Sequence, residues 1–187
     1  MGGDDLFVTR RRNQRDDFGW DLPDNLGGGV NSASNELTPG YLEDDEGTIT
    51  LYFASNRPGG LGGPDVYASV MNNDGTFGPA SLVSVLSSIS SDLFPTPRRD
   101  GLELFLSSNR VGTLGNQDLW VSTRPSTLDP WSAPVNLGPF VNTTANDLGG
   151  GLSFSRTTFS FHSNRAGGAG GADLYEMTRE KITGRDQ

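Results

Sequence analysis

The tripeptide Ser-Asn-Arg occurs three times in this 187-residue chain, and this repetition constrains the fold more than any other feature. The copies begin at Ser55, Ser108 and Ser163, which gives spacings of 53 and 55 residues. Each copy is followed by a glycine-rich stretch and then by an Asp-apolar-aromatic triplet, and a fourth triplet begins at Asp5. A period of this length is typical of propeller blades and related repeat arrays.

Other residues keep nearly fixed offsets from the tripeptide and so define the repeating unit. An acid-leucine pair begins at Glu36, Asp92 and Asp147, and an aromatic residue followed by a proline stands upstream of each pair. The segment before each tripeptide shows period-2 alternation of apolar residues, as in a half-buried strand. No segment shows a convincing helical period, so we expect units of four short antiparallel strands and almost no helix.

These units predict an all-β propeller of four-stranded blades, about three per chain, in one domain spanning residues 1–187. The approximate repeats are a half blade with an outer strand at 1–28, blades at 29–84 and 85–139, and a blade lacking its own outer strand at 140–187. Propellers usually have four to eight blades, so three are too few to close a ring. We expect either a piece of a longer propeller or a homodimer. In the dimer, Trp20–Leu26 would complete the partner's last blade and close a six-bladed ring.

Composition excludes several classes of partner and cofactor. The net charge of −9 lacks the basic stripe that nucleic acid binding needs. The chain has no cysteine and only one histidine, which removes thiolate and histidine-rich metal sites. No stretch is long and apolar enough for a membrane span. We therefore expect no cofactor, no nucleic acid partner and no membrane insertion.

The pattern Asp-x-x-Pro, Asp-Gly, Leu-x-Phe-x-Ser-Asn-Arg and Asp-Leu-Trp runs through the units and is nearly complete between Asp92 and Trp120. This pattern resembles the WD-like repeats of TolB-type β-propellers, and the likeness covers nearly the whole chain. The resemblance implies a non-enzymatic scaffold that binds a protein or peptide. It also implies a bacterial envelope setting, periplasmic or extracellular.

Four residues are candidates for a binding site at one mouth of the central channel. Glu36, Asp92 and Asp147 begin the innermost strands, so a closed ring would place them around that mouth, and His162 is the only histidine. A ring of carboxylates would suit a divalent cation or a cationic group. The alternative is that each acid accepts hydrogen bonds from backbone amides or from the arginine of a Ser-Asn-Arg tripeptide and so fixes the register of its blade. We favour this alternative because the position recurs in every unit.

A second set of residues is expected to form a structural network that recurs in each blade. A guanidinium presents five donors in a rigid fork, which can tie a carboxylate to loop carbonyls. We expect the tripeptide arginines to pair with the acids of the Asp-apolar-aromatic triplets. The members of this network are Arg57, Arg110, Arg165, Asp65, Asp118 and Asp173.

A rival function is a carbohydrate-active or carbohydrate-binding propeller that uses carboxylates at the central channel. Two such groups would act as acid and base, with Glu36 or Asp92 as the candidates. Acids that are all engaged by arginine or backbone groups would count against those candidates.

Overall fold

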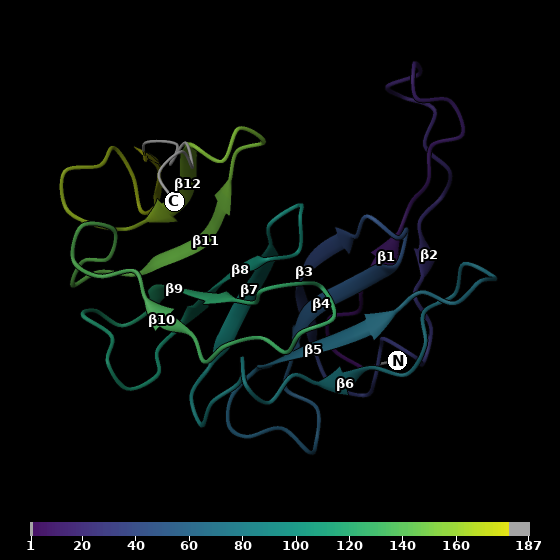
Figure 1. Ribbon diagram of the computed structural model, residues 1–187, viewed down its shortest axis with the longest axis horizontal. Helices are drawn as coiled ribbons and strands as arrows, with labels where there is room; N and C mark the ends of the chain where they lie inside the picture. The colour runs from purple at the N-terminus through teal and green to yellow at the C-terminus, as the bar shows by residue number, and fades with distance from the viewer. Residues whose placement is uncertain (1, 180–187) are drawn as a thin grey trace.

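The computed structural model describes residues 2–179, and the regular structure of this part is entirely β-strand (Figure 1). These residues form no helix, and so none that could cross a membrane. The all-β class and the antiparallel sheets expected from the repeats are confirmed. The outer ends of the expected repeats 1–28 and 140–187, namely residue 1 and residues 180–187, lie outside the described part.

Two complete blades form the middle of the chain, and each is a four-stranded antiparallel sheet whose strands follow one another in sequence order. The strands of the first blade are β3 (Glu36–Glu43), β4 (Ile49–Ser55), β5 (Asp65–Val70) and β6 (Ser81–Leu82). The strands of the second blade are β7 (Asp92–Pro97), β8 (Glu103–Ser108), β9 (Asp118–Thr123) and β10 (Val135–Asn136).

Incomplete sheets flank the two complete blades. The third blade has three strands, β11 (Asp147–Leu152), β12 (Thr158–Ser163) and β13 (Asp173–Thr178). The N-terminal half blade is a pair, β1 (Phe7–Val8) and β2 (Asp24–Asn25), joined by a long hairpin that projects from the body (Figure 1). The inner strands β3, β7 and β11 lie next to one another, with β7 in the middle.

The hydrophobic core is divided into three layers, one at each junction between sheets. Phe53 and Leu6 belong to the layer between the half blade and the first blade. Leu104 and Tyr52 belong to the next layer, and Phe105 and Phe159 to the last. Blades therefore stabilise one another face to face, which explains why both faces of β4 and β8 are buried.

Each inner strand carries an irregularity two residues after its first acid. The pairing register shifts there in β3, β7 and β11. Thr38, Phe94 and Gly149 adopt positive φ angles of 48°, 53° and 65° at these places. Gly40, within the first shift, has no room for a side chain, because a Cβ would collide with the carbonyl oxygen of Pro95 on the next blade. The bulges thus let the inner strands approach closely.

Candidate functional site

The inner strands begin in a buried ion-pair network that recurs in every blade. In the second blade, Arg110 donates to the Asp92 carboxylate at 2.6 Å, to the Ser108 hydroxyl at 3.0 Å and to the Leu86 carbonyl at 2.6 Å. The Ser108 hydroxyl donates to the same carboxylate at 2.6 Å. Asp92 is completely buried, so its charge is balanced within the protein.

The first and third blades repeat this arrangement. Arg57 donates to Glu36 at 3.0 Å and also to the carbonyl of Val30. Arg165 donates to Asp147 at 2.6 Å and to the carbonyl of Val141 at 2.7 Å. The three acids expected at a channel mouth are therefore brought into one kind of environment, each buried beneath the arginine of its own tripeptide.

The acids of the Asp-apolar-aromatic triplets also recur in each blade, but they bind loops. They do not pair with the tripeptide arginines, contrary to the expectation from the sequence. Asp118 accepts hydrogen bonds from the Leu114 amide at 2.7 Å and from the Asn136 side chain at 2.7 Å. Asp65 and Asp173 likewise accept backbone amides of their glycine-rich loops. The arginines pair with the inner-strand acids instead, because the tripeptide ends beside the start of the inner strand.

The carboxyls of Glu36 and Asp147 are held in the ionised form. Burial alone would raise the pKa of Glu36, but hydrogen bonds from Ser32 and Ser55 and the charge of Arg57 outweigh it, so the pKa is lowered. Burial opposes ionisation of Asp147 too. There the bonds from Ser163, Arg165 and Thr143 dominate and lower the pKa. Both groups are stable carboxylates rather than proton donors.

His162 lies on β12, half-buried between the second and third blades. Its ring packs edge-to-face against Phe94 of the second blade, with ring centroids 5.7 Å apart. A Cβ on Gly149 would collide with the imidazole ring, so this histidine fills the space that the glycine leaves. His162 is thus placed in a junction between blades.

A cavity lies at the opposite end of the inner strands, around the turns that join the first and second strands of each blade. It measures about 830 Å³ and is bordered by all three blades. We call it the turn cavity. Its lining residues are Tyr41, Leu42, Glu43, Asp44, Asp45, Pro97, Arg98, Arg99, Asp100, Leu152, Ser153, Phe154 and Arg156.

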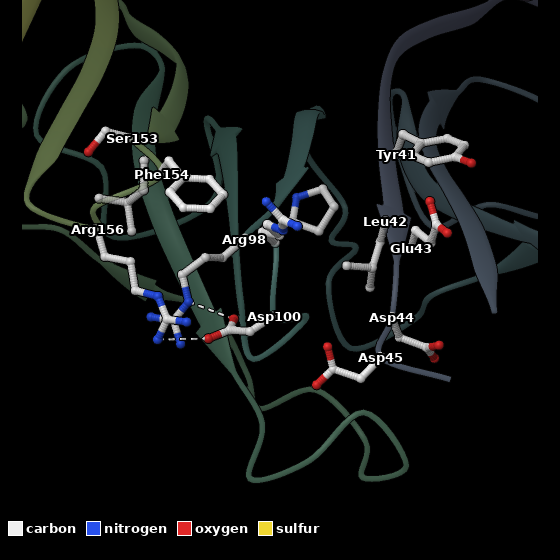
Figure 2. Close-up of a pocket in the computed structure, with 13 residues that line it drawn as sticks. Tyr41, Leu42, Glu43, Asp44, Asp45, Arg98, Asp100, Ser153, Phe154 and Arg156 are labelled. Atoms are coloured by element: carbon white, nitrogen blue, oxygen red, sulfur yellow. Dashed lines mark hydrogen bonds and ion pairs between the residues drawn. The ribbon is translucent and has the colours of Figure 1, made fainter. Parts of the chain in front are cut away.

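The first blade contributes an acidic side to the turn cavity. Tyr41, Glu43, Asp44 and Asp45 lie together on this side, apart from the arginines (Figure 2). Asp44 accepts the amide of Thr48 at 2.8 Å, so it shapes its own turn. Glu43 and Asp45 are exposed and make no ion pair within residues 2–179. Their oxygens are available to a ligand.

The second and third blades contribute a side with paired charges. Asp100 is bound by Arg98 at 2.7 Å and by Arg156 at 3.2 Å, as the dashed lines in Figure 2 show. Arg98 also pairs with Glu103 at 2.7 Å. Burial would raise the pKa of Asp100, but hydrogen bonds from Arg98 and the Leu102 amide and the charges of Arg98 and Arg156 lower it. Asp100 is therefore held as a carboxylate.

Two aromatic rings on the rim of the turn cavity are exposed to solvent. Tyr41 is 55% exposed and Phe154 is 82% exposed. The Arg99 guanidinium lies over the Phe154 ring, 4.7 Å from its centre. Burial and the charge of Glu43 raise the pKa of Tyr41 against the opposing charge of Arg10, so the phenol stays protonated and can donate a hydrogen bond.

None of the residues that line the turn cavity was among the site residues expected from the sequence. Those expectations followed what the repeats share, whereas the turn cavity is built from positions at which the repeats differ. One signal was present: the acidic turn Asp44-Asp45-Glu46-Gly47 makes the first unit longer than the others between its acid and its tripeptide.

Solved structures of three glycoside hydrolases resemble this chain. An α-L-arabinofuranosidase from Lactobacillus brevis aligns over 94% of this chain and 63% of its own, with 15% identity and a TM-score of 0.59. A thermostable family-43 glycoside hydrolase aligns over 86% and 60%, with 12% identity and a TM-score of 0.55. An endo-1,4-β-xylanase from Bacteroides thetaiotaomicron aligns over 80% and 56%, with 17% identity and a TM-score of 0.50. This chain thus spans less than two thirds of the length of each.

The comparisons confirm the propeller fold and correct the family expected from the sequence. No protein-family model and no curated protein matches the chain. The assignment to TolB-type propellers is wrong, because the three solved structures described above are glycoside hydrolases. The expectations of a non-enzymatic protein and a scaffold are overturned by the same finding, and the envelope setting loses its basis. The pattern led to the wrong family because its residues form the buried framework of a blade, which any blade of this type needs.

No cluster of three or more His, Cys, Asp or Glu side chains within residues 2–179 is arranged to hold a metal ion.

Proposed function

We propose that this chain is the glycan-handling part of a carbohydrate-active propeller and that the glycan binds in the turn cavity. The observation that carries this proposal is the juxtaposition of exposed aromatic rings and exposed carboxylates in one large concave site. Sugars present apolar C–H faces, which pack on aromatic rings, and hydroxyl groups, which donate to carboxylates. Tyr41 and Phe154 supply the rings, while Glu43 and Asp45 supply acceptors.

The fold supports the same class of ligand. The solved structures with this fold include an arabinofuranosidase and a xylanase, which are named for glycosides of two pentoses. We therefore propose a pentose-containing glycan as the ligand. The net charge of −9 repels an anionic polymer, so it is better suited to a neutral glycan than to an anionic one.

Hydrolysis of a glycosidic bond at this site would require one carboxyl group that donates a proton and one that stays ionised. Asp100 suits the ionised role, because two arginines hold it as a carboxylate. Asp44 is engaged in its turn. Glu43 and Asp45 remain as candidates for the donor. Glu36 and Asp92 are poor candidates, since a buried, salt-bridged acid cannot reach a glycan.

Titration calorimetry with arabino- and xylo-oligosaccharides tests the binding step. We expect Tyr41→Ala and Phe154→Ala each to weaken binding about tenfold, because each ring loses apolar contact worth about 1.5 kcal/mol. Phe140→Ala is the matched control: that ring is 89% exposed but lies in the loop before β11, at the other end of the molecule. Binding that is lost equally in the control, or absent from the unmodified protein, would refute the proposal.

A second measurement addresses the chemistry. Release of reducing ends from the same oligosaccharides should fall at least a hundredfold in Glu43→Gln or in Asp45→Asn, whichever residue is the donor. Binding should change much less, because the amide oxygen of Gln or Asn still accepts a hydrogen bond. If neither change affects release, a carboxyl outside the turn cavity performs the reaction.

A further inference from the structure

A second, apolar cavity of about 170 Å³ lies between the second and third blades. Its walls are mainly Phe105, Leu137, Val141, Leu152, Phe159 and Met177, with Thr178 and Arg179 at the edge. We call it the socket. Apolar space of this size is costly, because well-packed interiors leave few voids larger than a water molecule.

The equivalent place between the first and second blades is filled by Trp131. This ring is 8% exposed and packs edge-to-face against Tyr52, with ring centroids 6.3 Å apart. Its indole N–H donates to the Tyr52 hydroxyl at 3.3 Å. Tyr52 and Phe105 occupy the same position relative to the tripeptide, as do Leu104 and Phe159. The socket therefore has the walls of a tryptophan site without the tryptophan.

An arginine marks the edge of both places. The Arg124 guanidinium lies 4.2 Å from the centre of the Trp131 ring, and its Nε donates to the Gly101 carbonyl at 2.6 Å. Arg179 stands at the same distance from its triplet and donates in the same way to the Arg156 carbonyl at 2.9 Å. Arg179 therefore occupies at the socket the position that Arg124 occupies beside Trp131.

The tryptophan belongs to a segment that also supplies the outer strand of its blade. In the second blade Trp131 is followed at the third position by Pro134 and then by β10. In the first blade Phe77 and Pro79 precede β6 in a similar way, and Phe77 is 9% exposed. Within residues 2–179 no outer strand pairs with β13 and no aromatic ring fills the socket.

The half blade carries the missing segment. Trp20 is followed at the third position by Pro23 and then by β2. Arg11 lies over the Trp20 ring at 5.1 Å, as Arg124 does over Trp131. Yet Trp20 is 52% exposed, because no complete blade lies beneath it. The molecule thus has an aromatic segment without a socket and a socket without an aromatic segment, at opposite ends of the row of blades.

We propose that the occupant of the socket is Trp20 of a second copy of this chain. The segment from Trp20 to Asn25 of one copy pairs with β13 of the other, and the ring enters the socket. In doing so β13 takes the place of β1, which it resembles: Asp5-Leu6-Phe7 matches Asp173-Leu174-Tyr175. Leu6 is 8% exposed whereas Leu174 is 84% exposed, so the exchange buries Leu174 as its equivalents in other blades are buried.

The exchange replaces bonds of the N-terminal segment with equivalent ones. Leu6 gives up its two bonds with the Asn31 side chain, at 2.8 and 2.9 Å, and Leu174 of the other copy takes them up. Leu119 makes the same two bonds with Asn142 in the second blade. β1 and β2 are two residues each, joined by the pairs Phe7↔Asn25 and Val8↔Asp24. Six-residue β13 offers a longer edge. Reciprocal exchange joins two chains of three blades head to tail and leaves no open blade, which gives a closed ring of twofold symmetry.

Sedimentation velocity over a range of concentrations tests this proposal. The unmodified chain should form dimers, and Trp20→Ala should weaken the association at least tenfold. Phe18→Ala is the matched control, because Phe18 is 95% exposed on the same hairpin but lies outside the segment; it should leave the association unchanged. A chain that stays monomeric at every concentration, or species larger than a dimer, would overturn the ring.

A second variant approaches the socket from the other side. Leu137→Trp fills the socket from within its own chain, so association should weaken about as much as in Trp20→Ala while the monomer stays folded by its circular dichroism spectrum. Dimers that persist in both variants would show that other surfaces hold the copies together, and would overturn the proposal.

Discussion

The two ends of the inner strands differ in how strictly the blades repeat one another. At the end where these strands begin, all three blades place an acid under an arginine with a serine between them. At the turn end, corresponding positions carry Asp44, Arg98 and Ser153, whose amides donate across the turn to the carbonyls of Thr48, Glu103 and Thr158. The backbone is thus repeated at both ends, whereas the side chains are repeated at only one.

This difference separates framework from site. A side chain that every blade needs must satisfy the same backbone groups in every blade, so it is fixed by folding. The turn positions carry no such common duty, because the turns share only a backbone hydrogen bond. Their side-chain bonds differ: the carboxylates of Asp44 and Asp100 accept amides in the first and second turns, and the Ser153 hydroxyl accepts one in the third. They are therefore free to differ, and together they form an asymmetric cavity with an acidic side and a side of paired charges.

Acid should produce the largest effect, because it acts on the networks of several blades at once. The pKa values of Glu36 and Asp147 are lowered in the folded protein, so their contribution to stability is present above the pKa of the unfolded chain, about 4, and is lost as the pH falls through the folded values. Urea titrations should give a steady free energy of unfolding from pH 7 to about 5 and a steep decline below about 4.

Asp100 at the turn end also has a lowered pKa, so it provides the control for this titration. Asp100→Asn should keep most of the acid-induced loss if the framework end causes it. If the decline disappears in this variant, the turn end dominates the pH dependence and the comparison between the two ends fails.

Replacement of a single framework acid should come next. Asp92→Ala leaves Arg110 buried without its carboxylate, and the expected loss is about 3–5 kcal/mol in the free energy of unfolding. Chemical denaturation measures this loss. Asp45→Ala, at the turn end, should change the same quantity by no more than about 0.5 kcal/mol, because that side chain is exposed and unpaired within residues 2–179. Similar losses of unfolding free energy in the two variants would show that the two ends of the inner strands do not differ in their contribution to stability.

The framework could be predicted from the sequence because it repeats. Spacing located the four-stranded units and identified Arg57, Arg110 and Arg165 as structural candidates. The sequence left two partners open for each arginine, since Asp92 and Asp118 are both acids near the tripeptide and only the fold decides which one lies beneath Arg110. The spacing of residues along the chain reveals the repeat, but it does not show which of two nearby acids the fold places against the arginine.

The candidate site could not be predicted in the same way. Repeat alignment discards the positions that vary, and these are the ones that meet around the turn cavity. Glu43 and Phe154 are far apart in the sequence and come to line opposite sides of one cavity only when three blades stand around one axis (Figure 2). The family was misjudged for a related reason: identical framework residues describe any blade of this type, while differences between turns distinguish one propeller from another.

The smallest of these expected effects on stability concerns Arg98. This residue lies at the turn end, where side chains vary, but it makes ion pairs as the framework residues do. Arg98→Ala removes partners from Asp100 and Glu103, but Arg156 still lies 3.2 Å from Asp100 and Arg179 lies 3.4 Å from Glu103. The expected loss is about 1–3 kcal/mol in the free energy of unfolding, because neither acid is left alone. Arg99→Ala, an exposed neighbour that makes no ion pair in the described part of the chain, should change it by no more than about 0.5 kcal/mol. A loss for Arg98→Ala as large as that for Asp92→Ala would mean that the turn end is as much framework as the other end. The asymmetry of the turn cavity would then reflect folding requirements rather than a ligand.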